Sequence, residues 1–107
     1  MDDAFYIKEG DTSPALRYTL SPTVDLTGAT VRFSMRARGQ ATPVLDRVAA
    51  TVVAPATGGV VQYDWQAGNT GTAGFYDAEF EVTYADSTIE TFPNRGFIPV
   101  LVDGDIA

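Results

Sequence analysis

Hydrophobic and polar residues alternate with a period of two along most of the chain, and no long stretch shows a helical stripe. One clear example is Ala29–Ala37. There Val31, Phe33 and Met35 share one face, and the residues between them are polar. The pattern predicts seven or eight short strands: Phe5–Lys8, Ala15–Leu20, Ala29–Ala37, Val44–Val53, Val60–Trp65, Phe75–Tyr84, Thr88–Phe92 and Phe97–Val102.

Two of these segments are less regular than the others. Val44–Val53 breaks the alternation, which predicts either two short strands or one strand with a bulge. Pro99 has no backbone N–H and therefore cannot be fully paired inside a sheet. We expect the last strand to lie at a sheet edge or to carry a bulge there.

Several short strands in about 100 residues favour an all-β, immunoglobulin-like sandwich, with a small barrel as the alternative. The segment before Ala78 is similar to a tyrosine corner, in which the hydroxyl of Tyr76 would bind nearby backbone, and Ala78 stands where such domains carry a cysteine. Aromatic packing must then replace the disulfide. The candidate core residues are Phe33, Tyr63, Trp65 and Phe80. We expect one domain over residues 1–107, with its core at about 5–102 and a frayed tail at 103–107.

Composition supports the strand prediction and removes several classes of function. Val, Ile and Thr together outnumber Leu and Met by 28 to 7, a bias that suits pleated strands. The sequence has no Cys and no His, so disulfides, cysteine nucleophiles, Ser-His-Asp triads and most zinc sites are excluded. No apolar run is long enough to predict a membrane span.

Charge is distributed unevenly along the chain. Residues 1–53 carry six basic and six acidic side chains, whereas residues 54–107 carry one basic and eight acidic ones, which accounts for the net charge of −7. An acidic half repels phosphate, so we expect no nucleic-acid partner. The asymmetry could attract the basic face of another protein or of a second copy, or simply keep a β protein soluble.

The candidate chemistry is weak. Asp77, Glu79 and Glu81 share one strand face, as paired catalytic carboxylates could, but nothing nearby predicts a dry pocket that would raise one pKa. Cross-strand pairing with Arg32, Arg36 or Arg38 explains the same pattern. The terminal acids Asp2, Asp3, Asp103 and Asp105 do not have the spacing of a calcium loop. We therefore expect no catalytic residue, metal or cofactor.

Four strings of residues resemble a known family when taken in order. They are Asp25–Val31, Gly59–Trp65, Gly74–Val82 and, later, Thr91-Phe92-Pro93, and the match runs from about Ile7 to Val102. The pattern resembles the immunoglobulin-like N-terminal domain of phage baseplate upper proteins and of related small phage tail and virion proteins. The resemblance implies a non-catalytic virion component, made in the host cytoplasm, that docks one structural protein onto another.

Within that role we expect an interaction module bound to baseplate, tail or neck components, in a symmetric ring or lattice, or as a homo-oligomer. A capsid decoration protein is one alternative, and a host-surface carbohydrate- or receptor-binding module is another. Exposed Tyr6, Tyr18 and Phe97 could line a sugar- or protein-binding surface, or simply pack at the core or an edge. The candidate interface residues are Arg38 and Gln40 in one loop, Asn69 and Thr70 in a second, and Pro99 at the last strand.

Overall fold

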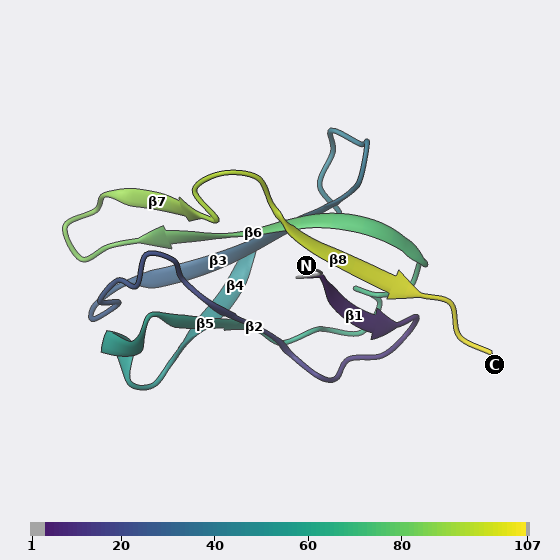
Figure 1. Cartoon of the computed structure of the whole chain (residues 1–107), viewed down its shortest axis with the longest axis horizontal. Helices are drawn as coiled ribbons and strands as arrows, with labels where there is room; N and C mark the ends of the chain where they lie inside the picture. Colours follow the sequence, from purple (N-terminus) through teal and green to yellow (C-terminus); the bar gives the residue numbers. More distant parts are fainter. Residues whose placement is uncertain (1–3, 107) are drawn as a thin grey trace.

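The computed structural model describes residues 4–106 of the chain. These residues form eight strands and one short 3-10 turn, so the predicted all-β class is confirmed (Figure 1). The elements are β1 (Phe5–Lys8), β2 (Leu16–Thr19), β3 (Thr30–Ala37), β4 (Leu45–Val53), η1 (Ala56–Gly58), β5 (Val60–Tyr63), β6 (Gly74–Thr83), β7 (Ile89–Phe92) and β8 (Ile98–Asp103).

The strands form an immunoglobulin-like sandwich of two sheets that share β4. Neighbouring strands follow the order β1-β8-β6-β3-β4-β5-β2, and β7 pairs with the distal part of β6. The first half of β4 pairs with β3, and its last residues, Thr51 to Val53, pair with β5. Every pairing is antiparallel except that of β1 with β8.

β4 contains a local irregularity a few residues before it changes sheet. The β3–β4 register shifts between Phe33 and Met35, and Arg47 adopts a positive φ of 50°. Its backbone N–H donates to the Ser34 hydroxyl over 2.9 Å instead of to the ladder. The segment is thus one strand with a bulge.

Aromatic rings fill the space between the sheets. Phe33 is completely buried and stacks on Tyr63 with 4.4 Å between ring centroids. Trp65 meets Phe33 edge-on at 5.8 Å, and the Phe80 ring lies 5.0 Å from that of Phe33. These rings occupy the centre that a disulfide occupies in many domains of this fold.

Tyr76 anchors the start of β6. Its hydroxyl donates a 2.6 Å hydrogen bond to the carbonyl of Thr72, four residues upstream, which is the geometry of a tyrosine corner. Burial raises the pKa of Tyr76 above its ordinary value, so the hydroxyl remains a donor. The bond holds the loop before β6 against the sandwich.

Two turns use the same Asp-x-Thr device. Asp25 accepts hydrogen bonds from both the hydroxyl and the N–H of Thr27, at 2.6 and 2.9 Å. Asp86 accepts the same pair from Thr88 in the β6–β7 hairpin. The hydrogen bond from the threonine hydroxyl, and then the one from its N–H, lowers the pKa of each carboxyl below its ordinary value.

The segment between β4 and β5 contains the short 3-10 turn η1. Gly59 ends this element with φ of +67°, and a Cβ there would lie 3.0 Å from the Val24 carbonyl oxygen. Only glycine combines that conformation with so close an approach.

None of the helical structure in residues 4–106 is long and apolar enough to cross a membrane.

We predict that alkaline pH weakens the β6–β7 hairpin through Tyr84. Burial first, and then the hydrogen bond to Glu90 and its negative charge, raises the pKa of Tyr84 from 10.0 to about 12. Because the folded pKa is the higher one, this contribution is fully present below pH 10 and is lost as pH rises toward 12.

Urea unfolding at about pH 9 and about pH 11 tests this expectation. The Tyr84→Phe variant should lose less stability between the two values than the natural chain does. Equal losses in both proteins would show that Tyr84 does not couple folding to pH.

Candidate functional site

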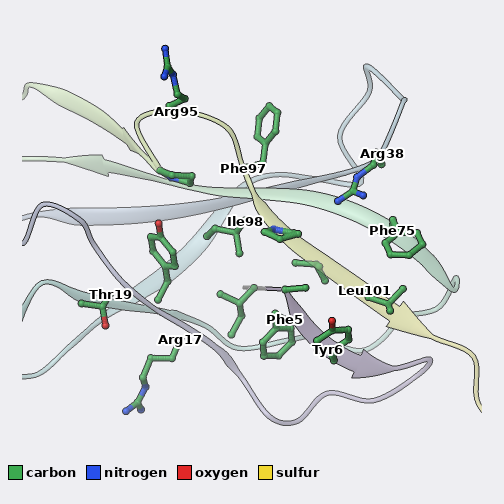
Figure 2. Close-up of a pocket in the computed structure, with 16 residues that line it drawn as sticks. Phe5, Tyr6, Arg17, Thr19, Arg38, Phe75, Arg95, Phe97, Ile98 and Leu101 are labelled. Carbon is green, nitrogen blue, oxygen red and sulfur yellow. The ribbon is translucent and has the colours of Figure 1, made fainter. Parts of the chain in front are cut away.

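A broad groove of about 1040 Å³ runs along the first half of β8, where the two sheets part. Its walls come from β1, β2, the start of β6, β8 and the loop that precedes β8 (Figure 2). All four residues of β2 line it. Because β1 pairs only with Val100 to Asp103, the first residues of β8 have no strand on that side among residues 4–106.

The backbone of β2 presents alternate residues to this groove. Leu20 donates its N–H to the Gly59 carbonyl over 2.8 Å, in register with the β2–β5 ladder. In an antiparallel pair the bonded positions alternate, so Leu16 and Tyr18 also bind β5. The N–H and C=O groups of Arg17 and Thr19 therefore point away from β5, toward the open edge.

Pro99 occupies the corresponding position on β8. The N–H of Arg38 donates to the Phe75 carbonyl, which places the odd-numbered positions of β6 against β3 and the even-numbered ones against β8. Tyr76 and Ala78 therefore bind Val100 and Ile98, and the backbone of Pro99 faces away from β6. Because proline has no N–H, this position costs the β6–β8 ladder no hydrogen bond, and Pro99 lies at the open start of β8, just before the residues that pair with β1.

Aromatic side chains form the exposed rim of the groove. Tyr6, Leu101 and Phe75 are in register across β1, β8 and β6, so they form a row on the outer face of that sheet. Tyr6 is 52% exposed, Phe75 57% and, nearer the loop before β8, Phe97 44%. Tyr18 also lines the groove, so the three aromatics singled out in the sequence lie at one site.

Three arginines line the groove, and none of its lining residues is acidic. Arg38 lies over the Phe75 ring at 5.3 Å and also donates to Asp77 over 3.3 Å. Arg17 donates to the Gln62 side chain, and Arg95 makes no ion pair among residues 4–106. In Figure 2, Arg95 and Arg17 stand on opposite sides of the groove. The groove is therefore basic in a protein of net charge −7.

The three carboxylates of β6 lie on the outer sheet face, beside rather than inside the groove. Arg36 and Arg38 approach Asp77 at 3.8 and 3.3 Å, and Arg47 approaches Glu81 at 3.5 Å. Two of the expected cross-strand partners thus bind Asp77, but Arg47 takes the place of Arg32 at Glu81. Within the described part of the chain, no cluster of three or more Asp, Glu, Cys or His residues could hold a metal ion.

The loop residues singled out in the sequence fall in different environments. Gln40 is exposed at the turn after β3, whereas Asn69 closes its own loop by accepting from Tyr63 and Gln66. The expectation that Thr70 lies at an exposed interface is corrected, because this residue is only 1% exposed. Its hydroxyl binds the Asp11 carbonyl over 2.7 Å, so Thr70 fastens the loop to the body and is removed from the candidate interface.

The groove brings together residues that sequence patterns did not. Arg38 and Pro99 line it as well as Tyr6, Tyr18 and Phe97. Arg17 and Thr19 of β2, Phe75 of β6 and Arg95 of the loop before β8 were not anticipated, because nothing in their local sequence marks them. The local signals were Pro99, which predicted a sheet edge, and the aromatic residues Tyr6, Tyr18 and Phe97.

No protein-family model matches the chain, and no curated protein matches it significantly. Among solved structures, the crystal structure of CopC from Methylosinus trichosporium OB3b is similar to this chain, with a TM-score of 0.55 and 13% sequence identity. The match covers 99% of this chain and 89% of that chain. At this identity the likeness shows a shared fold and nothing further.

The expected membership of the phage baseplate upper protein family is therefore wrong. No family model matches, and the similarity to the CopC structure offers no link to phage proteins. The strings that suggested the family have structural roles: Asp25 closes a turn, Trp65 is in the core and Tyr76 forms the corner. Such residues mark a sandwich fold rather than one family.

Proposed function

We propose that this chain is a non-catalytic structural protein whose immunoglobulin-like domain docks onto other proteins of a larger assembly through the groove between β2 and β8. The assembly that we propose is a phage particle, at its tail, baseplate or neck. This proposal is independent of membership of the baseplate upper protein family.

The residue types that line the groove are the main support for the proposed docking role. Aromatic residues and arginine are the types enriched where proteins meet, and they dominate the binding energy of such interfaces. Here Tyr6, Phe75 and Phe97 are exposed together beside Arg38 and Arg95. Exposed apolar clusters rimmed by polar residues often mark sites of protein–protein interaction.

Photo-crosslinking in purified particles tests the proposal. A photoreactive amino acid replaces Phe75, and a matched variant carries it at Ile89, which is 63% exposed but lies on β7, outside the groove. Crosslinks to particle proteins from position 75, and few from position 89, are the expected result. Quantitative mass spectrometry of the same particles then gives the copy number relative to the capsid protein.

The copy number separates the possible locations. A small multiple of three or six supports a ring at the tail, baseplate or neck. A number comparable with the capsid protein would instead make the chain a decoration protein. Absence from the particles, with the protein present in infected cells, would overturn the virion setting, and a glycan array that binds the chain would replace the protein partner with a sugar.

A further inference from the structure

We propose that the groove binds an extended, acidic segment of a partner protein, which adds as a strand to the free edge of β2. This inference deepens the proposed function and rests on it, because it names the chemistry of the partner at the same site. It follows from three independent features: the backbone groups at the edge, the charge of the lining and the aromatic rim.

The edge of β2 has backbone N–H and C=O groups with which another strand could pair. Arg17 and Thr19 both direct N–H and C=O groups into the groove, because Leu16, Tyr18 and Leu20 use theirs on β5. An extended peptide that binds such an edge gains main-chain hydrogen bonds, and its alternate side chains enter the flanking pockets.

The opposite wall cannot accept a strand in the same way. At Pro99 the backbone that faces away from β6 has no N–H to donate, and its carbonyl is in register to accept from Phe5 of β1, so neither group is open to a new strand. The incoming strand therefore pairs with β2 and contacts β8 through side chains. This asymmetry selects one edge of the groove.

Charge selects the kind of segment. Arg17, Arg38 and Arg95 reach the groove from β2, from the end of β3 and from the loop before β8, and no acidic side chain lines it. A segment with acidic residues at alternate positions can form ion pairs with these arginines. A basic segment would be repelled by them, and a neutral segment would form no ion pair.

The aromatic rim gives the segment an apolar contact as well. Phe5 and Tyr18 line the groove between the sheets, and Phe75 and Tyr6 lie on its outer rim. The inward-facing side chains of an added strand would pack on Phe5 and Tyr18. The preferred segment thus alternates acidic residues with aromatic or β-branched ones.

Fluorescence anisotropy with synthetic peptides tests the inference on the full chain. The probe is a labelled peptide of about ten residues that alternates glutamate with valine and tyrosine. One control peptide carries lysine in place of glutamate, and a second carries proline at alternate positions and so cannot pair with an edge. Only the first peptide should bind with measurable affinity.

Protein variants locate the binding. The double variant Arg17→Ala/Arg95→Ala should weaken binding of the glutamate peptide by about tenfold, because it removes two of the three arginines that line the groove. The matched control, Arg32→Ala, removes an exposed arginine outside the groove and should leave the affinity unchanged.

Amide hydrogen exchange distinguishes strand addition from simple charge attraction. In the complex the amides of Arg17 and Thr19 should exchange at least about tenfold more slowly, whereas that of Tyr18, already bound to β5, should not change. Protection of Tyr18 alone, or equal binding of all three peptides, would overturn the inference.

The outcomes also separate this inference from the proposed function. Crosslinks from position 75 to particle proteins, together with no binding of the glutamate peptide, would leave the docking role intact and overturn the acidic segment as its partner. A concentration-dependent dimer in sedimentation, crosslinked through Phe75, would make a second copy the occupant and overturn it likewise. Binding of the glutamate peptide with protected Arg17 and Thr19 amides would support it.

Discussion

Replacing Phe33 by alanine is expected to lower the free energy of unfolding by about 3–5 kcal/mol. Its ring is completely buried and contacts three other rings, those of Tyr63, Trp65 and Phe80, at centroid distances of 4.4 to 5.8 Å. Removing it leaves a cavity between the sheets where no disulfide holds them together. Domains of this size are stable by only about 5–15 kcal/mol, so the variant would be close to unfolding.

Urea unfolding followed by tryptophan fluorescence measures this loss, because Trp65 is the single tryptophan and lies against Phe33. Phe75→Ala is the matched control, since it removes the same side chain from a position that is 57% exposed. It should cost about 1 kcal/mol or less. Similar losses in the two variants would mean that the aromatic cluster is not the centre of the core.

Replacing Tyr76 by phenylalanine is expected to cost about 1–1.5 kcal/mol. The change removes one hydroxyl and its 2.6 Å hydrogen bond to the Thr72 carbonyl and leaves the ring in place. The loop between β5 and β6 should loosen first, because that bond joins it to the sandwich. Hydrogen exchange at residues 66–74, compared with β3, would show the loosening.

Tyr84→Phe is the control for the tyrosine corner. It also removes a hydroxyl with a short hydrogen bond, but its acceptor is the Glu90 side chain within one hairpin. We expect a smaller loss of stability and no change in the loop before β6. If Tyr76→Phe were as stable as the natural chain, the corner would have no role in holding the two parts of the fold together.

Much of the fold was predictable because each strand carries its own signal. β1 was predicted to the residue and β3 to within one, since the alternation of buried and exposed residues decides both burial and strand position. The bulge in β4 was left open in the sequence. The positive φ of Arg47 and the bond to Ser34 that settle it depend on the neighbouring strand.

The candidate site was much less predictable. Arg17 and Arg95 are far apart in sequence and lie on opposite sides of the groove only after the sheets are assembled. Thr70 looked like an exposed loop residue, because a threonine between Asn69 and Gly71 has no local sign of burial. Its bond to Asp11 joins segments 59 residues apart, a contact that no local pattern contains.

The parallel pairing of β1 with β8 sets how the domain would carry mechanical load. Force applied between a partner attached before β1 and another attached after β8 would slide these strands past each other along their length (Figure 1). In that direction the force is shared by all the hydrogen bonds between Phe5–Lys8 and β8, so they must break together rather than one after another. The domain would therefore resist pulling through its two ends far better than peeling at β7, whose hairpin can open bond by bond.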